Sequence, residues 1–193
     1  MITNIKQDVR RKAELLYGDA SIANCLRALP HRGTLAGMVY RFGRQAGAVK
    51  FKPLSLLLKV AYFVLFYLVQ MFTGISIQSY ARIGKGMVVC NFSGIFVLAE
   101  EIGENFTVYE GVTVGNIRGK PRLAIIGDNV TLEPGCKVLG DVTIGDNVVV
   151  RANSLVITDV PANSIAIGNP ARIVPMKTEE KVEEPKERMA QHG

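Results

Sequence analysis

Few side chains in this sequence of 193 residues are suited to act as a nucleophile, a base or a metal ligand. The three cysteines, Cys25, Cys90 and Cys136, lie far apart, and His31 and His192 are the two histidines. No CxxC pair and no cluster of cysteine with histidine occurs, so we expect neither a metal site nor a disulfide framework. Isolated thiols in odd number are typical of a reducing compartment.

The stretch MVVCNFSGI, residues 87–95, places Cys90 beside Asn91 among aliphatic residues. A thiol attacks as a thiolate, and no base or cation stands near Cys90 in the sequence, so we expect it, like Cys136, to be a buried or corner residue. An asparagine amide exchanges hydrogen bonds but does not take up a proton at pH 7. The other candidate bases are Glu110 and His31, for which a corner residue and an exposed cap residue are the structural alternatives.

The elements that must position these residues follow from a six-residue period that begins after residue 74. Aliphatic residues stand at positions 77, 83, 89 and 95 and, after one extra residue, at 102, 108, 114, 126, 132, 138, 144, 150 and 156. Only Lys120 interrupts the series. Neither a helix nor an ordinary strand has this period, whereas a β-helix has one inward side chain and one turn per six residues. The sequence therefore predicts a triangular parallel β-helix.

Turn residues support the same fold. The segments IGEN at 102–105 and IGDN at 126–129 and 144–147 supply the Gly, Asn and Asp that tight corners need. The segment IAIGNPARIVP, residues 165–175, is expected to form the closing rung. We therefore divide the chain into a helical, basic segment at 1–73, a β-helix at 74–176 and a charged, mobile tail at 177–193.

The first segment has helical patterns at IKQDVRRKAELL and GTLAGMVYRFGRQAG, followed by an apolar run at residues 54–72 that begins after Pro53. This run is 19 residues long and contains Lys59. Three interpretations remain open: packing between subunits, contact with a membrane surface, and a membrane span. The opening residues are polar and show no secretory signal, so we expect a cytoplasmic protein, at the inner face of the membrane if residues 54–72 contact lipid.

Charge is concentrated in the same segment. Residues 1–75 contain 11 Lys and Arg against 3 Asp and Glu, whereas residues 76–176 contain 8 against 9. Such asymmetry is found in proteins that bind anionic membranes or nucleic acids. No nucleic-acid motif and no platform of interleaved aromatic and basic residues accompanies it, so we expect no nucleic-acid partner.

Several stretches resemble one known family, the hexapeptide-repeat acyltransferases. They are TGISIQSYARIGKGMVV, the repeated IGDNV, EGVTVGN, KVLGDVTIGDN and VPANSIAIGNPARIV. The serine O-acetyltransferase-like branch, which includes enzymes that acetylate sugar hydroxyls of exopolysaccharides, is the most similar. The resemblance covers residues 73–174 and, more loosely, 1–72. It implies a left-handed parallel β-helix, assembly as a homotrimer, and acetyl-CoA bound along the prism near a subunit boundary.

The resemblance also implies direct acetyl transfer, in which a histidine oriented by a carboxylate takes the proton from the acceptor hydroxyl. In this sequence Asn91 stands at the place of that histidine, and Ser76 at the place of the carboxylate. A second histidine of serine acetyltransferases aligns near Leu123. The candidate catalytic positions are therefore Asn91, Ser76 and Glu110, without the usual base.

The positions that the resemblance assigns to CoA also depart from the family. EPGCK at 133–137 stands where the family often has GAGAK, and Pro134 offers no backbone N–H to the pantetheine arm. RANS at 151–154 stands where GAGS is common. Lys and Arg side chains at corners suit CoA phosphates, solvated surface charge being the alternative. The predicted CoA-binding residues are Gly115, Asn116, Arg118, Pro134, Lys137, Ala152, Asn153 and Arg172.

Three functions follow as hypotheses. The first is a CoA-dependent O-acetyltransferase that acts on a sugar or saccharide hydroxyl, with Asn91 in place of the catalytic histidine. The second is a trimeric scaffold or regulator that has the fold without the activity. The third is a membrane-recruitment module in which the basic helices are the functional part.

Overall fold

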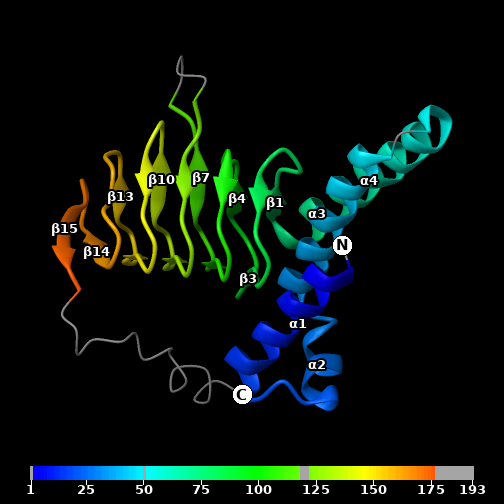
Figure 1. Cartoon of the computed structure of the whole chain (residues 1–193), viewed down its shortest axis with the longest axis horizontal. Coiled ribbons are helices and arrows are strands. Elements are labelled where there is room, and N and C mark those ends of the chain that lie inside the picture. Colours follow the sequence, from blue (N-terminus) through cyan, green and yellow to red (C-terminus); the bar gives the residue numbers. More distant parts are fainter. Residues whose placement is uncertain (1, 50, 118–121, 177–193) are drawn as a thin grey trace.

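The computed structural model describes residues 2–49, 51–117 and 122–176. Four helices come first: α1 (Ile2–Tyr17), α2 (Ile22–Ala28), α3 (Arg32–Ala48) and α4 (Lys52–Thr73). They lie at one end of a solenoid that contains all the strands (Figure 1). The expected helices near residues 5–16, 33–47 and 54–72 are confirmed. The short helix α2 was not expected; the hydroxyl of Ser21 caps it by accepting a hydrogen bond from the Asn24 N–H.

In the part of the chain that the structure describes, fifteen strands of two to four residues form three sheets. The five-stranded sheet has the order β1 (Ile75–Ile77), β4 (Ile95–Val97), β7 (Thr113–Gly115), β10 (Lys137–Leu139), β13 (Leu155–Val156). The four-stranded sheet has the order β2 (Arg82–Ile83), β5 (Glu101–Ile102), β8 (Ile125–Ile126), β11 (Thr143–Ile144). The six-stranded sheet has the order β3 (Val88–Val89), β6 (Thr107–Val108), β9 (Thr131–Leu132), β12 (Val149–Val150), β14 (Ser164–Ile167), β15 (Arg172–Pro175). Because strands three apart in sequence pair in parallel, the predicted three-sided parallel β-helix is confirmed.

The repeated aliphatic side chains fill the prism. Val108, Leu132 and Val150 are fully buried and stand in register on successive coils. One detail of the sequence-based register is wrong. In β4 it is Val97, two residues beyond the expected Ile95, that pairs with Ile77 of β1. The corner at Cys90–Gly94 is longer than a regular one, and this extra length moves the inward position along the chain.

The corners repeat as predicted, and side chains connect them. Amide side chains form a chain of hydrogen bonds of 2.9–3.1 Å in which each Nδ2 donates to the Oδ1 of the next coil. These residues are Asn105, Asn129, Asn147 and Asn163. All four have φ between 54° and 57°, the left-handed region that asparagine tolerates. Asparagine therefore serves both the turn and the stacking of coils.

The helices close the open end of the solenoid. Along the solenoid, the N–H groups of each coil donate to the carbonyls of the next, as from Gly84 to Ile102 at 2.8 Å. The carbonyls of the first coil therefore point away from the stack, where α1 and α3 supply side-chain donors at 2.5–2.8 Å. The pairs are Arg11 with Gly86, Lys12 with Val89, Tyr40 with Ala81, and Arg41 with Ile83 and Gly84. An unpaired strand edge is thereby covered.

The opposite end of the solenoid closes differently. Here β15 turns back and pairs antiparallel with β14, from Ser164↔Pro175 to Ile167↔Arg172. The prediction that residues 165–175 form the closing rung is confirmed. The predicted tail at 177–193 lies outside the described residues.

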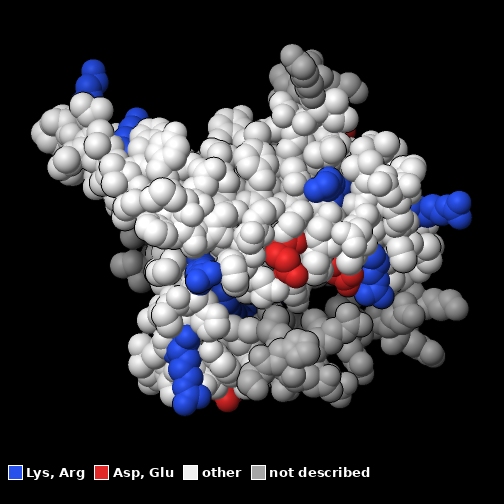
Figure 2. Space-filling model, turned by 180° about the vertical axis from the view of Figure 1, so that it is seen from behind, with Lys and Arg blue, Asp and Glu red and all other residues white. Residues whose placement is uncertain are grey.

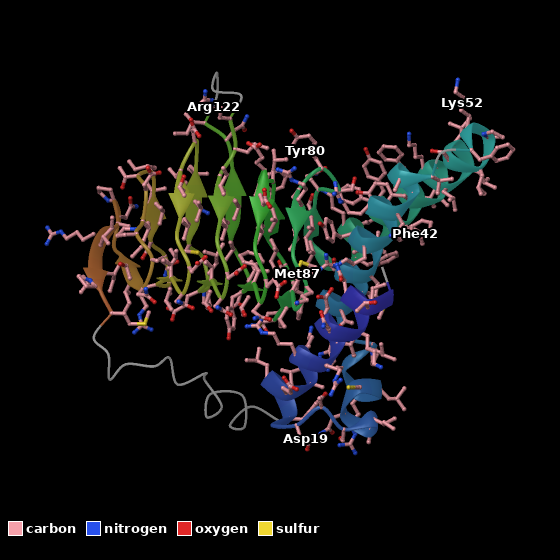
Figure 3. All side chains as sticks on the ribbon, viewed as in Figure 1. Asp19, Phe42, Lys52, Tyr80, Met87 and Arg122 are labelled. Carbon is pink, nitrogen blue, oxygen red and sulfur yellow. The ribbon has the colours of Figure 1, made fainter. Side chains whose placement is uncertain are left out.

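Helices α3 and α4 pack against each other as an antiparallel hairpin that projects away from the body (Figure 1). The ring of Tyr62 lies so close to Gly43 that a Cβ atom there would overlap it. Figure 2 shows this arm as uncharged surface with a few basic side chains and no acidic one on the visible face. Figure 3 labels Lys52 at its outer end. Helix α4 ends at Thr73, and Gly74, in the left-handed conformation, leads into β1.

Candidate functional site

Several sequence-predicted residues lie along one edge of the solenoid, which we call the Asn91 edge. It consists of the corner residues 90–94, 109–112, 133–136 and 151–154, each following a strand of the six-stranded sheet. Because Val89, Val108, Leu132 and Val150 are in register, the residues two positions later occupy equivalent places on successive coils. Those residues are Asn91, Glu110, Pro134 and Ala152.

The structure brings the first two of these side chains together. The Nδ2 amide of Asn91 donates a hydrogen bond to Oε2 of Glu110 at 2.7 Å. Asn91 is exposed and Glu110 is partly buried. The sequence named both residues but did not predict their contact. A carboxylate can accept a proton from a hydroxyl, and an amide donor holds it in place, so the pair offers an acceptor where the resemblance leaves a histidine missing.

The neighbouring thiols take no part in this chemistry. Cys90 is buried among Val88, Tyr109 and Leu15, and burial raises its pKa to about 11. Cys136 is fully buried, and burial raises its pKa to about 12. Both thiols are therefore protonated at neutral pH and unable to act as nucleophiles. The expectation that they fill space is confirmed.

The start of α3 packs directly on the Asn91 edge. The guanidinium carbon of Arg32 lies 4.3 Å from the centre of the Phe92 ring, a cation–π contact. At the next residue, a Cβ atom on Gly33 would overlap the carbonyl oxygen of Val89. Arg32 was missed in the sequence because no local pattern connects it to Phe92, 60 positions away. A positive charge therefore stands over Phe92, the residue that follows Asn91 in the chain.

His31 precedes these contacts at the expected N-cap position of α3, but its side chain makes no capping hydrogen bond and is partly buried rather than exposed. Its Nε2 lies 3.1 Å from the hydroxyl of Tyr17. Burial, with a smaller contribution from the charge of Lys12, lowers the pKa of the imidazole. The ring is therefore mainly neutral at pH 7, since the pKa of an unperturbed histidine is about 6.5.

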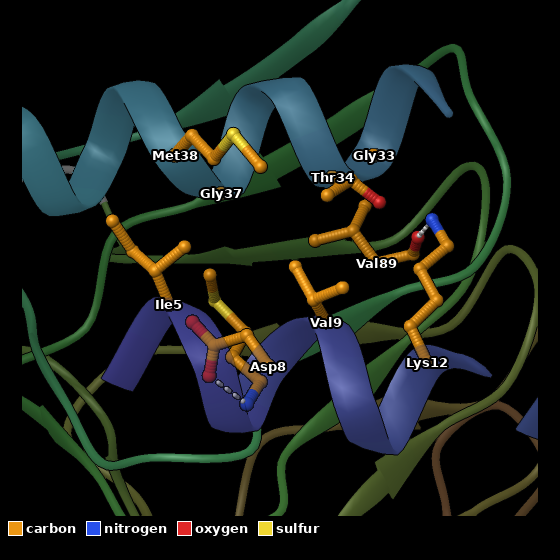
Figure 4. Close-up of a pocket in the computed structure, with 10 residues that line it drawn as sticks. Ile5, Asp8, Val9, Lys12, Gly33, Thr34, Gly37, Met38 and Val89 are labelled. Carbon is orange, nitrogen blue, oxygen red and sulfur yellow. Dashed lines mark hydrogen bonds between the residues drawn. The ribbon is translucent and has the colours of Figure 1, made fainter. Parts of the chain in front are cut away.

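Lys12 is the cation buried under the same corner (Figure 4). Its Nζ donates to the Val89 carbonyl at 2.7 Å, and burial lowers its pKa to about 8. A cavity of about 20 Å³ lies beside it, between α1, α3 and β3. That volume holds about one water molecule and no substrate, so the candidate site is the open edge rather than this cavity.

Ser76, the third candidate catalytic residue, lies on β1 in the adjoining sheet. It is buried, and its Oγ accepts a hydrogen bond from Nε2 of Gln78 at 3.2 Å. The side chain of Ser76 is therefore hydrogen-bonded to Gln78, whereas the side chain of Asn91 is hydrogen-bonded to Glu110. Leu123, aligned near the second histidine, is partly buried just before β8.

The residues predicted to bind CoA lie mainly along the five-stranded sheet and its borders. Pro134, Ala152 and Asn153 belong to the Asn91 edge, and Lys137 is exposed on β10. Gly115 ends β7, with the exposed Asn116 next to it at the other border of the sheet. Arg172 is exposed on β15, away from the others along the chain. Arg118 and Lys120 lie outside the described residues.

The segment RANS, residues 151–154, stands where the resemblance places a CoA-binding stretch, but two of its polar groups already have a partner. Glu133 accepts a hydrogen bond from the Arg151 guanidinium at 2.9 Å and from the Ala152 N–H at 3.0 Å. The Arg151 charge and the Ala152 amide are therefore already engaged by Glu133. Across residues 2–49, 51–117 and 122–176, no group of three or more His, Cys, Asp or Glu side chains is placed to hold a metal ion.

Comparison with known proteins places these features in a family. Residues 124–158 match the model of the bacterial transferase hexapeptide (six repeats). The serine acetyltransferase of Staphylococcus xylosus is 45% identical over 108 residues, which are 53% of this chain and 49% of that protein. The chain thus spans about half the length of this relative.

Solved structures give a broader overlap. Soybean serine acetyltransferase complexed with serine superposes with a TM-score of 0.72 and 31% identity, covering 89% of this chain and 68% of that one. A serine acetyltransferase in complex with CoA gives a TM-score of 0.70 at 25% identity, covering 89% and 70%. The chain therefore belongs to the hexapeptide-repeat transferases, in the left-handed β-helix acyltransferase branch that is similar to serine O-acetyltransferases.

Proposed function

We propose that the protein is an acetyl-CoA-dependent O-acetyltransferase whose reaction takes place at the Asn91 edge. The observation that carries this proposal is the 2.7 Å hydrogen bond between Asn91 and Glu110, at the place where the resemblance of the sequence implies a catalytic histidine. The names of the relatives, serine acetyltransferases with structures holding serine or CoA, support acetyl transfer from CoA to a hydroxyl.

In the proposed reaction the acceptor oxygen attacks the carbonyl carbon of the thioester. A C–O bond forms, the C–S bond breaks, and CoA leaves as its thiol. Glu110 takes the proton from the acceptor hydroxyl and passes it to the departing sulfur. Asn91 holds the Glu110 carboxylate through its amide N–H, and backbone amides at the edge stabilise the negative charge on the carbonyl oxygen.

Serine is the first candidate acceptor, since the matching relatives carry that name. Arg32, which lies over the Phe92 ring at this edge, offers a cation for the carboxylate group of an amino acid. A saccharide hydroxyl, expected from the sequence, is the second candidate, because neither the base nor the orienting carboxylate of serine acetyltransferases stands at Asn91 and Ser76. Both acceptors use the same step at Glu110.

Acetyl-CoA is proposed to bind along the five-stranded sheet, with Lys137 near its phosphates. The exposed side chain of Lys137 on β10 offers a cation for this role. We further propose that the chain forms a homotrimer in which a neighbouring subunit closes the open Asn91 edge. Light scattering coupled to gel filtration tests the trimer, and a monomer at micromolar concentration would contradict it.

The function is tested by measuring release of the CoA thiol from acetyl-CoA with a thiol reagent, for serine and for a panel of saccharides. We expect turnover with one acceptor class, and a loss of at least about 100-fold in kcat for Glu110→Gln, the scale of a lost general base. Glu101→Gln is the matched control, because Glu101 is an exposed carboxylate on β5, in another sheet. Equal rates for the wild type and Glu110→Gln would refute the role of Glu110.

The non-catalytic scaffold is separated from the enzyme by two further measurements. Titration calorimetry with CoA distinguishes a protein that binds the coenzyme from one that does not. Asn91→His restores the family's residue and is expected to raise kcat if the remaining site is intact. No turnover with any acceptor, by either wild type or Asn91→His, would favour the scaffold.

A further inference from the structure

Helix α4 presents an unusually large apolar surface to its surroundings. Within the described chain it is the one helix long and apolar enough to cross a membrane, and only 11% of its apolar window is buried. Phe72 is 73% exposed and Met71 71% exposed. The other exposed apolar side chains of α4 are Leu54, Leu56, Leu57, Val60, Phe63, Val64, Leu65, Tyr67 and Leu68.

This surface is not the outer side of an ordinary surface helix. The buried residues of α4 are Ser55, Tyr62 and Thr73, of which Ser55 donates to the Ala46 carbonyl of α3 and Tyr62 lies against Gly43. A surface helix of a globular protein buries its apolar residues and exposes polar ones. Helix α4 instead exposes most of its apolar residues, so packing against the neighbouring helix α3 does not account for its composition.

The few polar residues of α4 lie on one side of the helix. Lys52, Lys59 and Gln70 are separated by 7 and 11 residues, close to two and three whole helical turns. They therefore share one side of the helix. Each stands three positions before a buried residue of α4, so this side borders the buried one, and the rest of the circumference is apolar. Lysine side chains at the border of an apolar face can extend along it and place their ammonium groups in water or among headgroups.

The charge around α4 has one sign. No Asp or Glu occurs from residue 20 to residue 99, whereas that interval contains 9 Lys and Arg. A second copy that packed its α4 against this one would bring Lys52 and Lys59 of the two copies together, and α4 contains no acidic residue to pair with them. Anionic phospholipid headgroups supply the missing negative charge and attract each basic residue near the surface.

The hairpin geometry favours lying on a membrane over crossing it. The outer end of α4 is joined to α3, which runs back along it to the body (Figure 1). A spanning α4 would draw α3 into the bilayer, and α3 contains Arg44 and Gln45, both exposed. An arginine at the centre of a bilayer is strongly unfavourable, because its charge loses its hydration.

We propose that α4 inserts its apolar face into the interface of an anionic membrane, with Lys52 and Lys59 among the headgroups. The occupant of this surface is phospholipid, and the chain stays on one side of the bilayer. This inference goes beyond acetyl transfer and involves no residue of the Asn91 edge. It places the reaction next to a membrane.

The test is flotation of the purified full chain with vesicles of phosphatidylcholine alone and of phosphatidylcholine with 30% phosphatidylglycerol. We expect the protein to float with the anionic vesicles, and ~0.5 M salt to weaken this binding by shortening the range of the charges. The double variant Leu57→Glu/Val64→Glu is expected to lower partitioning by about 100-fold, because two apolar side chains no longer enter lipid.

The matched control is Ile22→Glu/Leu26→Glu on α2, where the side chains are 83% and 61% exposed but lie outside the arm. This control is expected to float like the wild type, and circular dichroism confirms that both variants are folded. Three results would overturn the proposal: no flotation of the wild type, equal flotation of the α4 variant, or a wild-type oligomer that stays off vesicles and dissociates in the α4 variant. The last result would assign the surface to a second copy of the chain.

Discussion

The solenoid and the helices that precede it obtain their structure in different ways. In the solenoid each coil repeats the one before, so Val108, Leu132 and Val150 occupy equivalent places and bury the same kind of side chain. The helices have no such repeat. Their contribution is made by individual side chains, such as Arg41, that reach the first coil. A stack of identical coils leaves the backbone carbonyls of its first coil without a partner coil, and side chains of the preceding helices supply the donors for them.

If single side chains hold the helices to the first coil, the substitution that lowers the free energy of unfolding most should lie at the junction of the two regions. Arg41 is 4% exposed, pairs with Asp8 at 3.0 Å and donates to two carbonyls of the first coil. We expect Arg41→Met to lower the free energy of unfolding by about 3–5 kcal/mol, because it leaves Asp8 buried without its partner. Denaturant unfolding measures this value.

The matched control for Arg41 is Arg82→Met. Arg82 also forms an ion pair, with Glu101 at 3.0 Å, but both side chains are more than half exposed. We expect a change below about 1 kcal/mol for this variant. Similar losses for the two variants would mean that the helices do not hold the first coil through Arg41.

The second prediction compares apolar residues of the two regions. Leu132 is fully buried in the prism, whereas Leu57 of α4 is 66% exposed. We expect Leu132→Ala to lower the free energy of unfolding by about 2–5 kcal/mol, through lost transfer energy and a cavity between coils. Leu57→Ala in aqueous buffer is expected to change it by less than about 0.5 kcal/mol. A large loss at Leu57 would show that the arm is packed in solution.

The third prediction concerns the pH dependence of the junction. Burial lowers the pKa of Lys12 to about 8 in the folded protein, against 10.5 for a lysine in water. Between these values the unfolded chain binds a proton that the folded protein has released, so folding becomes more favourable as pH rises. Below about pH 8 the ammonium is charged in both states, and its burial costs stability.

Stability measured at several pH values checks this. The unfolding free energy of the wild type, relative to Lys12→Met, is expected to rise by up to about 3 kcal/mol from pH 7.5 to pH 10.5. Taking the difference between the two proteins removes the titration of groups that Lys12 does not influence, such as Cys136. A difference that stays constant or falls with rising pH would show that burial does not lower the pKa of Lys12.

The smallest expected effect lies in the corner ladder of the solenoid. Asn147 donates to Asn163, accepts from Asn129 and has a φ of 56°. We expect Asn147→Ala to cost about 1–2 kcal/mol, from lost hydrogen bonds and a left-handed backbone without asparagine. Asn147→Gly keeps the backbone free and isolates the hydrogen-bond part. An equal loss in both variants would assign the whole effect to the ladder.

The sequence predicted the fold well where one physical cause repeats. Aliphatic residues six apart, from Ile77 to Val156, indicated the prism, and Asn and Gly at regular places indicated its corners. The register of β4 was missed because a longer corner at Cys90–Gly94 shifts Val97 into the place expected for Ile95. A period describes regular coils, not the lengths of individual corners.

The candidate site was predictable in its positions and not in its contacts. Alignment to the family pattern pointed to Asn91, and the search for another base pointed to Glu110; the register then brings the two onto adjacent coils. Their hydrogen bond depends on side-chain orientation, which no sequence pattern encodes. Arg32 was missed for a different reason, since it reaches Phe92 from a helix far away in the chain.

The amino-acid sequence by itself determined that this chain winds into a parallel solenoid, because each six-residue unit carries its own inward side chain and its own turn. Only the tertiary structure decided which side chains cover the first coil and which charged residues lie at the Asn91 edge. It also decided that the apolar surface of α4 stays exposed. Those features join residues such as Lys12 and Val89, 77 positions apart. A contact over that distance arises from the packing of complete elements, so it leaves no local signal in the sequence.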